Sequence, residues 1–379
     1  MLQKNNLTKT KLYFGEGCRY EIIKLLKKSK KSNILLITSE RSLKTIFIKE
    51  FIEEIQEISN LFFWTNIKTN PRSEDIEKCC KENFSKKISH IIGIGGGSIM
   101  DTAKAIAIGL EETDSIEQII YEKKKLKERR NKLMLAPTTS GTGSELSYGS
   151  ILTLPSGEKI GLRGKEVAAD FAFVDPYLSF SMPQEVIKVS GFDAMTHAIE
   201  TWISNAATKE TEEHSKSAIK SIFINLPKII NNHSDFTARK NVCYSSMMMG
   251  FNLSISSTCM PHRLQYPIGA STNSSHGDGL AILYNSWLEH LLKISPEKIS
   301  ECSKWLGIGK NSKNKAKVFV TAIKEFKKDI GMNPTVNSLG IELEEAKKFT
   351  SRVTGNLSLD PSYRDHRDIE KIYKDSLGF

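Results

Sequence analysis

The stretch HIIGIGGGSIMDTAKAIA, residues 90–107, decides the fold of the first half of the chain. An apolar run, His90 to Ile94, is followed by a glycine turn and then by the apolar and polar pattern of a helix. A strand that passes through such a turn into a helix directs backbone N–H groups and the positive helix end toward one point, where an anion binds. The stretch therefore predicts a parallel α/β unit with a diphosphate-binding turn at Gly95, Gly96, Gly97 and Ser98.

Outward from this stretch, short apolar runs alternate with polar helical patterns, as in a parallel α/β sheet. The expected strands are 33–38, 60–64, 90–94 and 132–136, and the expected helices run to residue 55, over 73–87 and to residue 109. After Asp175-Pro176 the pattern changes to long amphipathic helices over 184–204, 208–225, 236–254, 279–292 and 315–330. A length of 379 residues also favours two domains. We predict an α/β domain over residues 1–180 and an all-helical domain over residues 181–379.

A second polar turn, PTTSGTGSE over residues 137–145, also follows an expected strand. Its hydroxyls and glycines could line a nucleotide, and without a ligand it would be an elaborate loop with no purpose. Neither turn has the GxGxxG pattern of Rossmann domains, and no Lys-Ser or Lys-Thr pair of a Walker loop follows the glycines. Glycine runs also occur in ordinary tight turns, so the residues alone predict phosphate binding and nothing finer.

Asp193 and His197 are four residues apart in a helical pattern and so share one face of the helix. His262 and His276 lie fourteen residues apart, the second in a turn-rich segment. One carboxylate and three imidazoles suit Fe²⁺ or Zn²⁺ with a position open for a substrate oxygen, and the lack of thiolates argues against a structural zinc site. A histidine is more often a hydrogen-bonded polar residue, and spacing alone leaves that alternative open.

Bulk properties narrow the class of protein. The net charge of +10 comes largely from dispersed lysines without an arginine-rich stripe, so nucleic acid is not an expected partner. Six cysteines without a CxxC pair favour reduced thiols in a cytoplasm. The N-terminal residues 1–17 lack an apolar secretion signal, and no run of about 18 apolar residues occurs. We therefore expect neither secretion nor membrane insertion.

Taken together and in this order, GGGSIMDTAKAIA, PTTSGTGSE, FDAMTHAIE and PHRLQYPIGA with SSHGDGLA resemble the iron-containing, or group III, alcohol dehydrogenase family. The resemblance extends from Tyr13-Phe-Gly15 to Gly355-Asn356. It implies a dinucleotide-binding α/β domain, a helical domain, and a homodimer or larger homo-oligomer. It also implies hydride transfer between NAD or NADP and a small alcohol or aldehyde, with a metal that polarises the substrate oxygen.

The resemblance places the family's functional residues on matching positions of this chain. The implied metal ligands are Asp193, His197, His262 and His276, and all four match in residue type. The implied cofactor contacts are Gly95, Gly96, Gly97, Ser98, Asp101, Thr138, Thr139, Thr142, Ser144 and Lys159.

Two positions depart from the family pattern. Tyr266 stands where many members carry a histidine, so a phenol either relays a proton there or shapes the pocket, and we take Tyr266 and His262 as the catalytic residues. Ser39 stands where many members carry the acidic residue that holds the ribose 2′-hydroxyl, with Glu40 and Arg41 following. The lost negative charge favours NADP slightly over NAD, although Glu40 could take the acidic role.

The tail of the third-ligand motif, HRLQYP, indicates a divergent branch of the family. Arg263 and Arg163 are candidates for contact with an anionic substrate, but surface ion pairs are the favoured interpretation. Two rival functions remain at this point. A phosphate-eliminating cyclase resembling dehydroquinate synthase would use a carboxylate and two histidines, with a dense basic cluster that this chain lacks. An inactive binding relative would not be expected to keep all four ligands.

Overall fold

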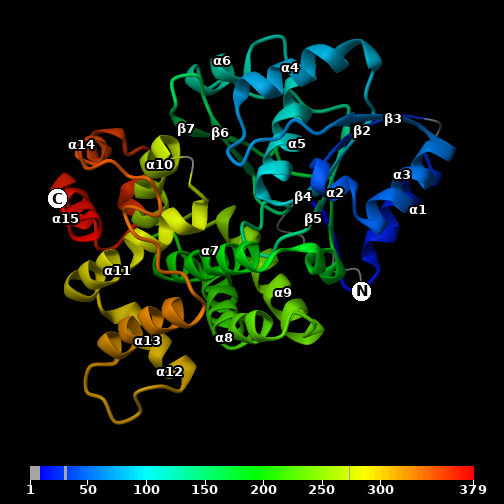
Figure 1. The fold of residues 1–379 in the computed structure, drawn as a ribbon. Helices are drawn as coiled ribbons and strands as arrows, with labels where there is room; N and C mark the ends of the chain where they lie inside the picture. Colours follow the sequence, from blue (N-terminus) through cyan, green and yellow to red (C-terminus); the bar gives the residue numbers. More distant parts are fainter. Residues whose placement is uncertain (1–8, 30–31, 273) are drawn as a thin grey trace. The chain divides into compact units, whose positions relative to one another are not determined.

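The computed structural model describes residues 9–29, 32–272 and 274–379. Residues 1–8, which belong to the stretch expected to lack a secretion signal, lie outside this description. The chain separates into two compact units, unit 1 up to Met182 and unit 2 from Pro183 (Figure 1). No helix in the described ranges combines the length and the apolar character that a membrane crossing needs.

Unit 1 is built on a six-stranded sheet in the order β1-β8-β5-β4-β2-β3, in which every pair of neighbours is parallel. Its strands are β1 (Lys11–Phe14), β2 (Asn33–Ile37), β3 (Asn60–Trp64), β4 (His90–Gly95), β5 (Lys132–Pro137) and β8 (Phe171–Val174). A separate antiparallel hairpin consists of β6 (Gly149–Thr153) and β7 (Lys159–Arg163). The predicted parallel α/β arrangement is confirmed.

Helices cover both faces of this sheet, because successive strand residues point to opposite sides. In β2, Leu35 and Ile37 belong to one buried cluster, whereas Ile34 and Leu36 belong to another. The first cluster packs against α4 (Ser73–Asn83), α5 (Gly97–Gly109) and α6 (Ile116–Tyr121). The second packs against α1 (Glu21–Lys27) and α3 (Ile46–Ile58), while the short α2 (Glu40–Leu43) follows β2. The helix expected over 73–87 ends at Asn83, and a 3₁₀ turn follows.

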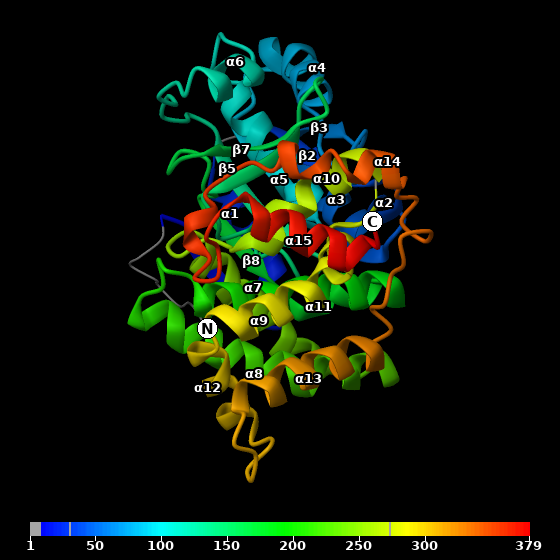
Figure 2. The ribbon, with the colours of Figure 1, turned by 90° about the vertical axis from the view of Figure 1, so that its left-hand side faces the viewer.

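All regular secondary structure among the described residues of unit 2 is helical, as predicted, and Figure 2 shows its helices from a second side. Its long helices are α7 (Gln184–Ile203), α8 (Lys209–Asn231), α9 (Phe236–Leu253), α10 (Met260–Thr272), α11 (His276–Ile294), α12 (Glu297–Leu306), α13 (Lys315–Asp329) and α15 (His366–Leu377). The short α14 (Leu343–Ala346) and two 3₁₀ turns precede α15. Helix α7 packs against α8, α9 and α11, and every residue from Gly191 to Thr201 is buried. A helix buried on all sides belongs to the core of its domain.

Two helices of unit 2 were not predicted from the sequence, and one of them carries a site residue. Helix α10 contains Pro261 in its first turn and Pro267 in its interior, and these prolines interrupt the helical signal. Helix α12 also went unrecognised. His276, expected in a turn-rich segment, is instead the first residue of α11, where the Ser275 hydroxyl accepts a hydrogen bond from Asp278 N and caps the helix.

Candidate functional site

One group of side chains in unit 2 has the donor types of a metal centre. Helix α7 holds Asp193 and His197 one turn apart, and both side chains are buried. Helix α10 supplies His262, and the first residue of α11 is His276. The Nε2 atoms of His197, His262 and His276 lie 3.7, 3.6 and 3.6 Å from Asp193 Oδ1. The four residues that the sequence singled out are therefore brought together.

The spacing of these atoms suits a cation between them. Four donors about 2.1 Å from a tetrahedral ion lie roughly 3.4 Å from one another, close to the observed separations. Ligand atoms of Asp193, His262 and His276 all lie within 4.8 Å of each other, and the His197 ring stacks on the His262 ring with centroids 4.6 Å apart. Asp193 Oδ1 and His262 Nε2 are buried and have no hydrogen-bond partner among the described residues. Such atoms are costly unless an ion satisfies them, so the residues fit a divalent metal.

The charge state of the group also suits metal binding. Burial opposes ionisation of Asp193, but the surrounding histidines outweigh it and hold the pKa of this carboxyl well below its usual range. Burial likewise opposes the charged form of His262, but Glu200 and Asp193 outweigh it and raise the pKa of this imidazole to about 9. An excess of negative charge that attracts a proton to the histidine also attracts a cation.

Two further side chains fix the orientation of the imidazoles, and neither was predicted from the sequence. Both carboxylate oxygens of Glu200 lie 2.8 Å from His262 Nδ1, and Glu200 Oε2 accepts a hydrogen bond from the Cys259 amide at 2.9 Å. Gln265 Oε1 lies 2.6 Å from His276 Nδ1. Glu200 was detectable, because it follows Asp193 by seven residues and so falls two turns along the same face of α7.

Tyr266 follows His262 by one helical turn on α10. Its hydroxyl accepts a hydrogen bond of 3.0 Å from Arg263 Nη1, so its own proton remains available for donation. Arg263 is 4% exposed, its Nη2 donates to Ser257 Oγ, and no acidic side chain in the described chain forms an ion pair with it. The favoured interpretation of Arg263 as a surface ion pair is therefore wrong, because α10 turns this side chain inward. Arg163 ends β7 and is exposed.

In unit 1 the two predicted phosphate-binding turns lie against each other. The parallel register of β4 and β5 places Gly95 opposite Pro137, and Thr138 N donates to Gly95 O at 2.9 Å. A Cβ atom on Gly97 would lie 2.5 Å from Thr142 Cγ2, and one on Gly96 would lie 3.3 Å from Thr139 Cγ2. The glycines thus let the second turn approach the N-terminus of α5, where unpaired N–H groups favour an anion. Such a cradle fits a diphosphate.

A buried ionic network supports these turns. Ser144 Oγ donates to Asp101 Oδ1 at 2.6 Å, and Asp101 Oδ2 accepts from Ile151 N at 3.0 Å. Lys104, fully buried, donates to Ser144 Oγ and to the carbonyl oxygens of Ser147 and Gly149. Burial lowers the pKa of Lys104 to about 8, although Asp101 and Glu145 oppose it. Sequence reasoning missed Lys104, whose signal is a second charge, three residues after Asp101, in an otherwise largely apolar helix α5.

Ser39 and Lys159, the remaining predicted cofactor contacts, lie elsewhere in unit 1. Ser39 follows β2 and caps α2, since its hydroxyl accepts from Ser42 N at 3.1 Å. Ser98 Oγ donates to Thr69 O, next to Asn70. Lys159 Nζ donates to Asn70 Oδ1 at 2.9 Å, and burial lowers the pKa of this ammonium to about 8. A buried cation without an anionic partner is suited to a ligand phosphate.

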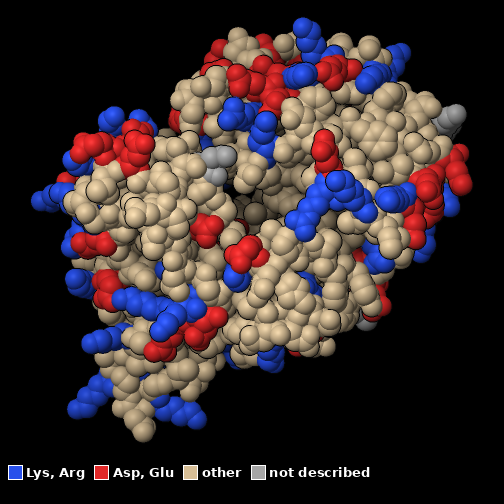
Figure 3. Space-filling view, viewed as in Figure 1, with Lys and Arg blue, Asp and Glu red and all other residues tan. Residues whose placement is uncertain are grey.

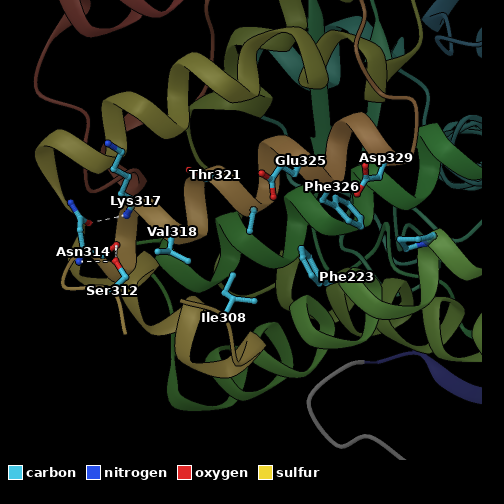
Figure 4. Close-up of a pocket in the computed structure, with 12 residues that line it drawn as sticks. Phe223, Ile308, Ser312, Asn314, Lys317, Val318, Thr321, Glu325, Phe326 and Asp329 are labelled. Carbon is cyan, nitrogen blue, oxygen red and sulfur yellow. Dashed lines mark hydrogen bonds between the residues drawn. The ribbon is translucent and has the colours of Figure 1, made fainter. Parts of the chain in front are cut away.

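One further surface feature is a hollow lined by none of the predicted site residues. This hollow of about 540 Å³ lies between α8 and α13 of unit 2, with Phe223 stacked on Phe326 in its wall (Figure 4). On the face drawn in Figure 3, basic and acidic side chains are interspersed. That mixture is what a solvated, dispersed lysine excess predicts.

Comparison with known families decides the class of protein. The model described as "Iron-containing alcohol dehydrogenase" matches residues 9–176, and that described as "Fe-containing alcohol dehydrogenase family, C-terminal" matches residues 187–377. The chain belongs to the iron-containing alcohol dehydrogenase family. It is 27% identical to Long-chain-alcohol dehydrogenase 1 of Geobacillus thermodenitrificans, with 96% of this chain and 94% of the relative covered. It is 26% identical to NADH-dependent butanol dehydrogenase A of Clostridium acetobutylicum, with 97% of both chains covered.

The crystal structure of an iron-containing alcohol dehydrogenase from Thermotoga maritima superposes with a TM-score of 0.84 at 27% identity, with 100% of both chains covered. The resemblance inferred from the motifs is therefore confirmed, as is the two-part fold. As a member of this family, the protein is an oxidoreductase that acts on alcohols or aldehydes and depends on a metal and a nicotinamide cofactor. The family match favours this activity over the phosphate-eliminating cyclase.

Proposed function

We propose that a single divalent ion, iron or zinc, is held in unit 2 by Asp193, His197, His262 and His276, and that this centre carries the alcohol dehydrogenase chemistry of the chain. The supporting observation is Asp193 Oδ1, a buried oxygen without a hydrogen-bond partner among the described residues, faced by three imidazole nitrogens at 3.6–3.7 Å. One oxygen and three nitrogens with an open position form a donor set typical of a catalytic divalent ion.

When bound, the ion supplies Lewis-acid polarisation of the substrate oxygen, and the nicotinamide donates or accepts the hydride. The chain positions the donors and handles the proton. In the reductive direction the substrate oxygen needs a proton, and Tyr266 Oη can donate one because its acceptor side is occupied by Arg263. The guanidinium also stabilises the phenolate that remains after donation. Tyr266 is therefore the proton donor in this proposal. His262, one helical turn before it on α10, binds the metal ion.

The nicotinamide cofactor binds unit 1 through its diphosphate. The turn at the positive end of α5 consists of Gly95, Gly96, Gly97 and Ser98. The second turn contributes Thr138, Thr139, Thr142 and Ser144. Asp101 holds the two turns together through Ser144, so its contribution is to shape the cradle. Lys159 adds a buried positive charge for a phosphate oxygen.

The chain accepts NADP as well as NAD, with NADP slightly favoured. Ser39 is neutral and follows β2, where an acidic residue would repel a 2′-phosphate. Arg41 lies in the same turn and is exposed, so it can pair with that phosphate, whereas the exposed Glu40 opposes it. The cofactor preference is the ratio of the two dissociation constants measured by fluorescence titration.

The cysteines support a cellular location, and the family supports a substrate class and an assembly. We place the enzyme in the cytoplasm, where the six cysteines, all free thiols, stay reduced. Small alcohols or aldehydes are its substrates, and it assembles as a homodimer or larger homo-oligomer. Sedimentation of the metal-loaded protein tests the assembly, and a monomer at micromolar concentration would contradict it.

Metal-depleted protein tests the function. It is purified anaerobically and assayed with NADH and NADPH against a panel of aldehydes, before and after addition of Fe²⁺. Iron is expected to restore turnover in the wild type and in His366→Ala, which removes an exposed histidine. It is expected to fail in His262→Ala. Full activity of metal-depleted wild type would contradict the proposed centre.

A further inference from the structure

The two histidines supplied by α10 and α11 are oriented by chemically different partners. His262 Nδ1 faces the carboxylate of Glu200, which is fully buried, with both oxygens at 2.8 Å. His276 Nδ1 faces the neutral amide oxygen of Gln265, also fully buried, at 2.6 Å. Sequence motifs gave Gln265 no role, because it lies inside a helix hidden by prolines.

We infer that Gln265 is a positioning residue that fixes the tautomer of His276 and so determines how tightly this histidine binds the metal. This inference rests on the proposed metal centre. An amide oxygen can only accept a hydrogen bond, so Nδ1 must carry the proton, which leaves the lone pair on Nε2, the atom that faces Asp193. With the amide reversed, its N–H would donate to Nδ1, the proton would move to Nε2, and His276 could not bind a cation. Hydrogen bonds of this kind on the far nitrogen typically set the affinity of a metal site.

The amide keeps this orientation despite a penalty, because its oxygen lies within hydrogen-bond distance of His276 Nδ1. Gln265 Nε2 is buried without a hydrogen-bond partner among the described residues. A Cβ atom on Gly279 of α11 would lie 2.8 Å from Gln265 Nε2 and 2.9 Å from its Cγ, so only glycine at this position leaves room for the amide. The unsatisfied N–H group of this amide is explained by the hydrogen bond that its oxygen accepts from His276.

The neutral character of Gln265 has its own consequence. Asp193 and Glu200 together carry two negative charges, which balance one divalent cation in a buried site. A third carboxylate at position 265 would leave the loaded site negative. The side chain of His276 is 33% exposed and that of His262 is 5% exposed. His276, held by an amide and nearer to solvent, is therefore the weaker ligand, and His262, held by a carboxylate, is the anchor.

Cobalt(II) binding to the full chain tests this inference. Affinity is measured by competition with a chelator, and the ligand-field absorption of Co²⁺ reports the donor set. Gln265→Met keeps the side-chain length and removes the acceptor, and it is expected to weaken Co²⁺ binding about 10- to 100-fold and to change the absorption. Gln265→Glu restores an acceptor and is expected to bind at least as tightly as the wild type. Ser245→Ala, which removes a buried hydroxyl of α9, is the matched control and should bind unchanged.

A purely structural role for Gln265 would lower the thermal stability of Gln265→Met and leave its Co²⁺ affinity within twofold of the wild type, which would overturn the inference. If Gln265→Met does not fold, Gly279→Ala replaces it, because the added Cβ displaces the amide without removing a polar atom. Unchanged affinity in that variant would equally overturn it. Failure of the proposed metal centre is distinguishable, since wild type would then bind no Co²⁺ or His276→Ala would bind it as tightly as wild type.

Discussion

Replacement of Lys159 by methionine should make the protein more stable and its cofactor binding weaker. Lys159 is 6% exposed, and burial lowers the pKa of its ammonium from 10.5 to about 8. One pKa unit corresponds to about 1.4 kcal/mol, so holding this charge in the fold at neutral pH costs about 3 kcal/mol. Methionine fills the same space without a charge and forgoes the hydrogen bond to Asn70, which contributes about 1 kcal/mol. A net gain of about 2 kcal/mol remains, an increase of roughly 4–8 °C in Tm.

The same change should remove a charged hydrogen bond to a cofactor phosphate. Such a bond contributes about 1.5–3 kcal/mol, which corresponds to a dissociation constant for NADPH roughly 10- to 150-fold higher. Calorimetry and fluorescence titration measure the two effects, with Lys125→Met, an exposed lysine of the same unit, as the control.

The stability difference should also depend on pH. The pKa of Lys159 is lower in the folded chain than in the unfolded one, so the penalty is fully present below about pH 8. It disappears as pH rises toward 10.5, where the ammonium is neutral in both states. The advantage of Lys159→Met should therefore shrink across this range. A variant less stable than wild type at neutral pH would contradict the predicted cost of the buried ammonium, and unchanged NADPH affinity would contradict its contact with a phosphate.

Three other substitutions test separate parts of the site. Tyr266→Phe removes the proposed proton donor beside Arg263. The turnover number for aldehyde reduction should therefore fall at least tenfold, and its pH profile should change. If Tyr266 only packs, both should stay unaltered. Gly97→Ala places a Cβ 2.5 Å from Thr142 Cγ2, so the two turns must move apart. Nicotinamide affinity should fall at least tenfold in titration, while the metal content stays constant. Unchanged affinity would show that the turns do not form the cradle. Ser39→Asp preserves a helix cap and adds a negative charge, so the NADPH dissociation constant should rise relative to that of NADH, and an unchanged ratio would place the ribose elsewhere.

The sequence predicted the elements whose signal is local. Helix α5 and its glycine turn are visible because an apolar strand, three glycines and a helical pattern follow one another. Asp193 and His197 could be paired because helical spacing alone places them on one face. The four metal ligands could be collected only through the family motifs, since His262 and His276 reach Asp193 through tertiary packing.

The partners of those ligands could not be predicted, because they depend on packing between distant segments. Gln265 meets His276 only because α10 continues through Pro267 and because Gly279 leaves room for the amide. Arginine is usually a surface residue, yet the position of Arg263 on α10 buries its side chain. In unit 1, Lys104 gains its partners from residues some forty positions away, a separation at which periodicity carries no information.

The proposed chemistry depends above all on one divalent ion between Asp193 and the three histidines. The most direct test is the metal content of the anaerobically loaded protein, wild type and Asp193→Asn, with His366→Ala as the control. We expect about one equivalent of iron or zinc in the wild type and the control, and almost none in Asp193→Asn, with nicotinamide binding retained in all three. Equal metal content in Asp193→Asn and wild type, or nicotinamide-binding wild type without metal, would contradict it.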